Sequence, residues 1–371
     1  MSVPDPRLRA AHEQMIAAGA TPVFPPAVLP ARTVLEVSGE AVRARMCVFL
    51  DNSGTELAMR PDMTTPIAAL FADGSIGEGR HVYCGDVYRL PRAGRAERVD
   101  FEQVGFEWFG EAGSSADAEA FGAAAEMTAA VGATGCVPAV GDVGLFHAVI
   151  DALGFSEDWA GRLKRSFSRV RGPEALLDAA LQTSEALSGS LRLGQALSNM
   201  EPADAVQAVE EMIESAGVPV FAGRTAEDVV ERLIGRAQSR LPDREQVAAL
   251  KGYLEIRRPL DEAASGVAEW ASQAGVGVGG GLDDLSTRHD RIAELAREHA
   301  AAAVFDASLG RRFEYYDGFA FEFAFEGALS APFLSGGRYD GLIARMQPQR
   351  RVAAIGAALR ADRLGPAGGA A

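Results

Sequence analysis

The stretch Arg311–Met346 decides the fold of this chain, and it reads RRFEYYDGFAFEFAFEGALSAPFLSGGRYDGLIARM. From Phe319 to Phe325, phenylalanine alternates with alanine or glutamate, and this period of two predicts a half-buried strand. Turn signals lie on both sides of this run, so we expect it to be one arm of an antiparallel sheet. The following Ser335–Gly341 predicts a glycine-rich turn, which either presents an arginine, a tyrosine and an aspartate to a ligand or is a plain tight hairpin.

Composition limits the kind of protein this can be. A chain of 371 residues is long enough for two domains and a large core, and its 48% hydrophobic content is that of a soluble globular protein. The net charge of −15 argues against a nucleic-acid surface. No apolar run approaches ~18 residues, so no membrane span is expected. The three cysteines lie far apart without CxxC spacing, which indicates reduced thiols and a cytoplasmic location.

Two hairpins are predicted in the first third of the chain. Met46–Leu50 is expected to be a buried strand, and Glu56–Arg60 returns from a turn at Asp51–Gly54. His81–Val87 and Phe101–Gly110 form the second hairpin. Arginines gathered in its loop bind an anion or pair with carboxylates, or they are simply solvated. These arginines are Arg89, Arg92, Arg95 and Arg98.

Two pairs of polar residues in this region could line a pocket. Asp62 and Thr64 precede a helix that begins with Ile67–Phe71, so either one could be its N-cap instead of a ligand contact. Gln103 and Glu107 are four residues apart in a strand and therefore point to the same face. That face is either a polar pocket or an ordinary exposed surface.

The rest of the chain supplies helices around this sheet. Phe155 to Gln273 contains repeated helix starts and few strand-like runs, so we interpret it as a helical insertion. The predicted domains are a core of residues 1–155 and 275–371 and an insertion of residues 156–274. The expected fold class is α+β. Further predicted elements are helices over 117–131, 142–153 and 283–302 and short strands over 137–140 and 303–306.

The sequence lacks the usual metal and cofactor motifs. Gly275–Gly281 contains a formal G-x-G-x-x-G, but a helical pattern precedes it, so we expect a loop and no dinucleotide site. The five histidines have no metal-ligand spacing, and there is no nucleophile elbow or P-loop. We therefore expect no metal and no cofactor.

Five segments, taken in chain order, resemble the motifs of histidyl-tRNA synthetase. The resemblance implies the catalytic-domain fold of class II aminoacyl-tRNA synthetases, which is a mostly antiparallel sheet flanked by helices and is normally dimeric. The segments are SGEAVRARMCVFLDNSGTELAMRPDMTTPIA (38–68), VYCGDVYRLPRAGRAERVDFEQVGFEWFG (82–110), RRFEYYDG (311–318), GGRYDGL (336–342) and AAIGAALRADRL (353–364).

The residues at the ATP site depart from that family pattern. Pro91 stands where the resemblance expects a glutamate that holds the adenine, and Val99 replaces a second arginine. Arg360 replaces the glycine at the floor of the adenine pocket, although Arg363 is kept. Because the sequence stops at Ala371, we expect no anticodon-binding domain of ~100 residues.

This combination resembles the regulatory subunit of short-form ATP phosphoribosyltransferase, a synthetase-like family without aminoacylation activity. The resemblance implies a non-catalytic subunit with no catalytic residues, which works with a separate catalytic subunit in the first step of histidine biosynthesis. It implies a hetero-oligomer, feedback regulation by L-histidine and a self-dimer. The alternatives are a truncated synthetase that still activates histidine, and another histidine-binding paralogue such as a translation-factor modifier.

The amino-acid pocket of the family is largely kept. By resemblance, Asp62 and Thr64 hold the α-amino group, and Asp62 replaces a glutamate, so its contact could run through water. The resemblance places Glu107 and Tyr316 at the imidazole. A zwitterion needs a carboxylate and a guanidinium, and an imidazole needs a donor and an acceptor, so these groups suit histidine. The resemblance also places Gln103 near the backbone end of the ligand, Arg311 at its carboxylate and Tyr339 where it closes the site. The remaining predicted histidine-binding residues are Arg89 and Tyr315.

Overall fold

The computed structural model of the chain describes residues 5–91, 98–167, 176–177, 185–215, 225–238, 242–309 and 315–365. These residues form a nine-stranded sheet in the order β1-β5-β6-β12-β11-β10-β7-β9-β8 and a three-stranded sheet in the order β2-β4-β3. Neighbouring strands are antiparallel except for β1 with β5 and β7 with β9. No helix within the described ranges is long and apolar enough to cross a membrane.

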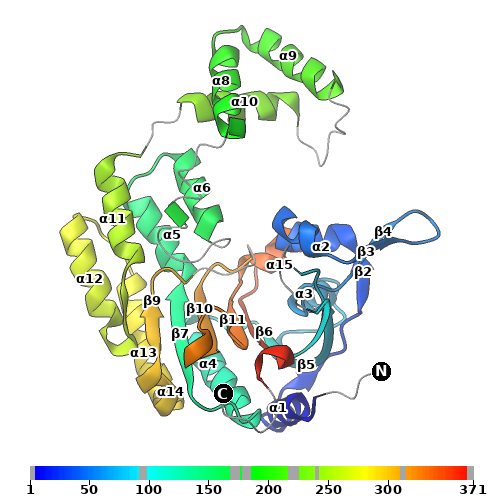
Figure 1. Ribbon diagram of the computed structural model, residues 1–371, viewed down its shortest axis with the longest axis vertical. Helices are drawn as coiled ribbons and strands as arrows, with labels where there is room; N and C mark the ends of the chain where they lie inside the picture. Colours follow the sequence, from blue (N-terminus) through cyan, green and yellow to red (C-terminus); the bar gives the residue numbers. More distant parts are fainter. Residues whose placement is uncertain are drawn as a thin grey trace.

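The strands of the large sheet come from both ends and the middle of the chain (Figure 1). They are β1 (Thr21–Pro22), β5 (Gly79–Tyr88), β6 (Asp100–Phe109), β7 (Cys136–Asp142), β8 (Arg257–Pro259), β9 (Val304–Asp306), β10 (Phe319–Phe325), β11 (Leu334–Arg338) and β12 (Ala354–Arg360). The small sheet consists of β2 (Val28–Pro30), β3 (Val48–Leu50) and β4 (Glu56–Met59). Both predicted hairpins are confirmed, since β3 pairs with β4 and β5 pairs with β6.

Helices surround the large sheet, and three of them stand apart from it. Figure 1 shows α8, α9 and α10 as a separate group at the top, where they have a small core of their own around Leu197 and Val209. The helices are α1 (Pro6–Ala17), α2 (Ala31–Ser38), α3 (Thr64–Ala72), α4 (Gly113–Ala130), α5 (Val143–Ala152), α6 (Glu157–Phe167), α8 (Glu185–Ser198), α9 (Pro202–Ser215), α10 (Ala226–Gln238), α11 (Arg244–Leu254), α12 (Ala263–Ala274), α13 (Gly281–Leu295), α14 (Arg297–Ala302) and α15 (Gly341–Met346).

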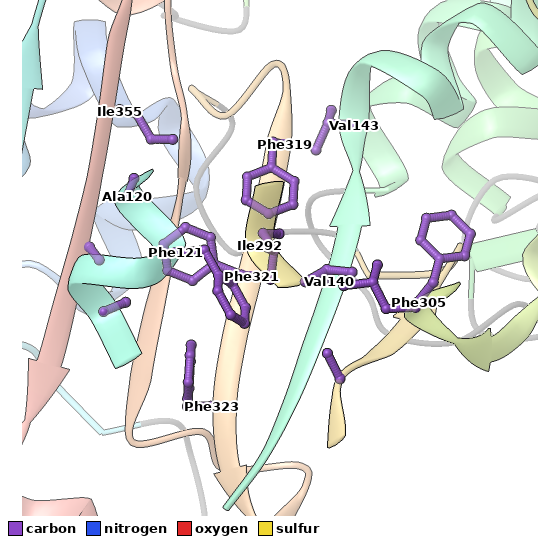
Figure 2. Packing of buried hydrophobic residues seen from close by; sticks show 14 of the residues in the cluster. Ala120, Phe121, Val140, Val143, Ile292, Phe305, Phe319, Phe321, Phe323 and Ile355 are labelled. Carbon is purple, nitrogen blue, oxygen red and sulfur yellow. The ribbon is translucent and has the colours of Figure 1, made fainter. Parts of the chain in front are cut away.

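One face of the large sheet carries the main hydrophobic core. The aromatic side chains of β10 point to this face, where the ring of Phe121 in α4 lies 5.7 Å from Phe321 and 5.1 Å from Phe323 (Figure 2). Residues of α1, α4 and α13 belong to the same buried cluster. Since side chains alternate along a strand, the intervening residues of β6, β10, β11 and β12 point to the opposite face. We call this opposite face the pocket face.

Three local predictions were wrong. Val48–Leu50 is a strand, but it is exposed at the edge of the small sheet and not buried. The strand from Phe319 is not half-buried, because its residues up to Ala324 are buried on both faces of the sheet. The expected glycine-rich turn at Ser335–Gly341 is instead strand β11 followed closely by α15, so Gly336 and Gly337 lie inside the sheet.

Other expectations are confirmed. The alanine-rich helix and the short strands occur as α4, β7 and β9, and the side chain of Asp142 caps α5 by accepting from the backbone N–H of Leu145 at 2.9 Å. The run at Gly275–Gly281 is a connection between α12 and α13, with Gly275 in the left-handed region at φ 67°. The predicted helix over 283–302 is divided into α13 and α14. The domain boundaries at 155/156 and 274/275 stay a prediction.

Candidate functional site

A cavity of about 80 Å³ opens on the pocket face, between the sheet and the start of α3. One water molecule needs roughly 10–15 Å³ by the same measure, so the cavity is large enough for a small metabolite. Its lining combines carboxylates, an amide, guanidinium groups and phenol rings. The lining residues are Asp62, Met63, Thr64, Tyr83, Arg89, Gln103, Tyr315, Tyr316, Glu322, Pro332, Phe333, Ser335, Ala358, Arg360 and Arg363.

Strand register explains why distant residues meet here. Gln103 of β6 lies directly opposite Arg360 of β12, and two residues further along β6, Gly105 lies opposite Ala358. Ala358 in turn lies opposite Ser335, which lies opposite Glu322 of β10. Residues directly opposite each other in neighbouring strands point to the same face, so these side chains share the pocket face.

Two buried oxygen atoms at the cavity have no hydrogen-bond partner within the described part of the chain. They are Oδ2 of Asp62 and Oε1 of Gln103, on side chains that are only 3% and 4% exposed. The other oxygen of Asp62 accepts from the backbone N–H of Thr65 at 2.7 Å, so Asp62 also stabilises the start of α3. Because a buried acceptor without a donor is costly, this pair is suited to a ligand that brings N–H groups.

Burial and neighbouring charges shift the pKa values of Asp62 and Arg89. Burial raises the pKa of the Asp62 carboxyl, while the Thr65 N–H and the Arg89 guanidinium oppose that rise. Burial lowers the pKa of Arg89 to about 10, against the attraction of Asp62. Arg89 donates from Nε to the carbonyl of Pro61, and its guanidinium carbon lies 5.4 Å from the ring centroid of Phe101. The first arginine of the hairpin loop is therefore a buried part of the site.

Arg360 fills the part of the site next to Phe101. Its guanidinium carbon lies 3.6 Å from the ring centroid of Phe101, which is a stacking distance. Its Nε and Nη2 donate to the two carboxylate oxygens of Asp362 at 3.0 and 2.7 Å, and the side chain is 11% exposed. The side chain is thus packed against the protein and not extended into solvent.

Glu107 lies beneath the cavity as an almost fully buried carboxyl, 1% exposed. Oε1 accepts from the hydroxyl of Thr64 at 2.6 Å, and Oε2 accepts from the hydroxyl of Tyr339. Burial raises the pKa of Glu107 to about 8, although both hydroxyl groups oppose the rise. An N–H donor is a favourable partner for this carboxyl group, because an oxygen that already accepts one hydrogen bond has a second lone pair to offer.

Three tyrosines gather around this carboxyl. The ring centroids of Tyr315 and Tyr316 are 4.7 Å apart, and Tyr339 lies edge-on to both, at 5.8 and 6.1 Å. Burial raises the pKa of Tyr315 and Tyr339 well above the ordinary phenol value, so both carry their proton. Of the three, Tyr315 and Tyr316 reach the cavity wall.

The structure brings together most of the site residues predicted from the sequence. Those that line the cavity are Asp62, Thr64, Arg89, Gln103, Tyr315 and Tyr316. Glu107 and Tyr339 lie behind that wall, where Glu107 contacts both Thr64 and Tyr339. Arg311 lies outside the described residues, as do Arg92 and Arg95, whereas Arg98 is exposed and pairs with Asp100 at 2.9 Å.

Sequence reasoning missed several residues of the site, among them Phe101, Asp362, Tyr83 and Glu322. Phe101 stacks with Arg360, Asp362 holds that arginine, and Tyr83 and Glu322 line the cavity. Phe101 and Tyr83 could have been found, because Phe101 is two residues before Gln103 and Tyr83 lies opposite Gly105, on the same side of the hairpin. Glu322 carried a weaker signal, as the one charged residue between the phenylalanines of a strand that proved to be buried.

Comparisons with known proteins identify the family of this chain. The family model for histidyl-tRNA synthetase matches residues 7–218 and 220–364. A curated protein of Chelativorans sp. (strain BNC1), named ATP phosphoribosyltransferase regulatory subunit, is 31% identical over 351 residues, covering 91% of this chain and 90% of its own. A protein of the same name from Mesorhizobium japonicum is 32% identical over 372 residues, covering 97% and 96%.

Solved structures share the fold. One, titled an ATP phosphoribosyltransferase regulatory subunit/histidyl-tRNA synthetase from Bacillus halodurans, has a TM-score of 0.63 at 22% identity and covers 97% of this chain and 77% of that one. The histidyl-tRNA synthetase of Nostoc sp. PCC 7120 has a TM-score of 0.61 at 15% identity, covering 97% and 69%. The fold is thus the class II synthetase fold expected from the sequence. The chain belongs to the histidyl-tRNA synthetase family, in the branch whose curated members are named ATP phosphoribosyltransferase regulatory subunits.

Proposed function

We propose that this chain is the non-catalytic regulatory subunit of an ATP phosphoribosyltransferase and that it binds L-histidine in the cavity on the pocket face. In this role it works with a separate catalytic subunit in the first step of histidine biosynthesis, in the cytoplasm. The assembly is a hetero-oligomer, and the chain also pairs with a second copy of itself. Histidine regulates the complex by binding one quaternary state more tightly than another.

One observation carries the proposal more than any other, namely the contrast between two sets of groups that meet at this cavity. Asp62 and Gln103 offer buried acceptors that suit an ammonium group. Arg360, directly opposite Gln103, stacks on Phe101 at the position that the resemblance assigns to the adenine floor. A guanidinium in that place leaves no room for a purine, because Asp362 holds it there through two hydrogen bonds.

The charges of the cavity also fit a zwitterionic amino acid. The carboxylate of Asp62 is complementary to an α-ammonium, and the buried guanidinium of Arg89 is complementary to an α-carboxylate. Beneath the cavity, the carboxyl of Glu107 is placed for an imidazole N–H. A site with these polar groups discriminates against side chains that lack a ring N–H, since the buried carboxyl would then lose a donor.

Titration calorimetry with L-histidine tests the ligand directly. It should be run on the chain alone and on the complex with the catalytic ATP phosphoribosyltransferase subunit, with histidinol and L-glutamine as comparison ligands. We expect heat with L-histidine in at least one sample. The absence of heat in both samples would remove the histidine-sensing part of the proposal, and failure to co-purify with the catalytic subunit would remove the subunit part.

A truncated synthetase is the competing function from another class. It predicts histidine-dependent exchange of pyrophosphate into ATP. We expect none, because Pro91, Val99 and Arg360 replace three of the groups that the resemblance requires for ATP. Measurable exchange would favour the synthetase.

A further inference from the structure

Glu107 can lie where it does only because a glycine faces it. Gly356 of β12 is the residue directly opposite Glu107 of β6. A Cβ atom at position 356 would stand 1.7 Å from Oε2 of Glu107, 2.6 Å from its Cδ and 2.7 Å from the carbonyl oxygen of Phe106. The carboxyl group therefore lies across the neighbouring strand, in space that any other residue at 356 would fill.

The next strand repeats the arrangement with a tyrosine. Gly337 of β11 is directly opposite Gly356. A Cβ atom at 337 would stand 2.9 Å from Cδ1 and 3.1 Å from Cε1 of Tyr316, and 2.8 Å from the carbonyl oxygen of Phe319. The ring of Tyr316 therefore lies over Gly337 as the carboxyl of Glu107 lies over Gly356.

Space, and not backbone conformation, is what these two positions require. Neither Gly337 nor Gly356 is among the glycines with positive φ. Both lie in regular strands, where glycine weakens the sheet and usually marks a place that something approaches closely. The neighbouring Gly336 is different, because its missing Cβ makes room for Phe321 on the core face.

We infer that Gly337 and Gly356 are positioning residues for ligand recognition. Side chains of directly opposite residues share a face, and the Cα atoms of such pairs are about 4.5–5.5 Å apart. The pair thus forms a flat floor across two strands, on which Glu107 and Tyr316 lie side by side beneath the cavity. This arrangement presents an acceptor and a phenol to one planar ring, so the two glycines set the side-chain specificity of the site. The inference rests on the proposed function, since it assigns the floor of the same ligand site.

Two kinds of measurement test this inference. The first is the free energy of unfolding by urea of the wild type, Gly356→Ala, Glu107→Ala and the double variant. If the methyl group collides with the carboxyl, Gly356→Ala costs less stability in the Glu107→Ala background than alone. If Gly356→Ala lowers the free energy of unfolding equally in both backgrounds, the Glu107 carboxyl does not lie across Gly356 and the inference is wrong. This result does not depend on any ligand.

The second measurement is the affinity for L-histidine. We expect Gly356→Ala and Gly337→Ala each to bind L-histidine about fivefold more weakly, as the loss of one hydrogen bond between uncharged groups predicts. Gly327→Ala is the matched control, because a Cβ there would have no neighbour within 4 Å, and it should bind as the wild type does. Adding Glu107→Asp to Gly356→Ala should recover part of the affinity, since the shorter side chain withdraws the carboxyl group from the methyl group while the contact with the Phe106 carbonyl oxygen stays.

The outcomes separate the two proposals. Wild-type affinity in Gly356→Ala, or no recovery by Glu107→Asp when both variants are folded, would overturn the positioning role while histidine binding stands. Failure of the wild-type chain and of its complex to bind L-histidine would overturn the proposed function. The coupling between positions 107 and 356 in unfolding would then still decide whether the glycine places the carboxyl.

Discussion

Replacing Glu107 with glutamine should flatten the dependence of stability on pH. Burial raises the pKa of Glu107 to about 8, from an ordinary value of 4.5. Between these two values the folded protein keeps a proton that the unfolded chain has released. The stability that this proton contributes is fully present below pH 4.5 and is lost as the pH rises toward 8.

The magnitude follows from the size of the shift. One pKa unit corresponds to about 1.36 kcal/mol, so the free energy of unfolding should fall by roughly 2–3 kcal/mol between about pH 5 and pH 7 because of Glu107 alone. Glutamine has nearly the same shape but does not titrate. Asp62 and Asp317, whose pKa values burial also raises, titrate in both proteins, so the difference between the two proteins isolates Glu107.

The assay is urea unfolding of the wild type and Glu107→Gln at about pH 5, 6 and 7, the range in which the linkage acts. Glu214→Gln on the exposed surface of α9 controls for the removal of one negative charge. We expect the control to follow the wild type, because water solvates that carboxyl in the folded and the unfolded chain. Equal slopes for Glu107→Gln and the wild type would refute the idea that burial governs the carboxyl beneath the cavity.

Three further predictions concern histidine binding at Asp62, the position of Arg360 and the stability contributed by Asp117. Asp62→Ala should weaken L-histidine binding at least about tenfold in calorimetry, because the α-ammonium group would lose its buried carboxylate partner. Unchanged affinity would contradict the proposed orientation of the ligand. Arg360→Gly should remove the guanidinium from Phe101 without restoring histidine-dependent ATP–pyrophosphate exchange, since Pro91 and Val99 remain; exchange above background would show that position 360 alone blocks ATP. Asp117→Ala should cost about 3–5 kcal/mol in urea unfolding, because Arg288 and Arg338 both pair with this buried carboxylate, at 3.0 and 2.6 Å; a cost below ~1 kcal/mol would contradict that role.

Periodicity and turn chemistry predicted much of the sheet. The alternation in Phe319–Phe325 indicated one strand of the antiparallel sheet, and the turns at Asp51–Gly54 and beyond Tyr88 indicated two hairpins. Burial was harder to predict, because it depends on what lies above each face. The run at Val48–Leu50 is apolar yet lies at an open edge of the small sheet, whereas Glu322 is charged yet buried.

The candidate site was predicted as a set of residues but not as an arrangement. Resemblance to a family selects positions such as Asp62 and Gln103 without any knowledge of distance. It could not indicate that Glu107 lies behind the cavity wall, because that depends on the strand register that places a glycine opposite it. Nor could the glycines of Ser335–Gly341 be assigned to a strand, since glycine favours turns unless close packing on a sheet requires its small size.

The stacking of Arg360 on Phe101 has a consequence for what the cavity can sense. Because Arg360 is part of β12, its guanidinium competes for the Phe101 ring at a fixed effective concentration. A dissolved nucleotide would compete for the same ring only in proportion to its concentration. The fraction of sites occupied by an amino acid would then depend on the concentration of that amino acid and not on the concentration of ATP. Together with Pro91 and Val99, this arginine would in this way turn the two-substrate site of a synthetase scaffold into a site that responds to one ligand.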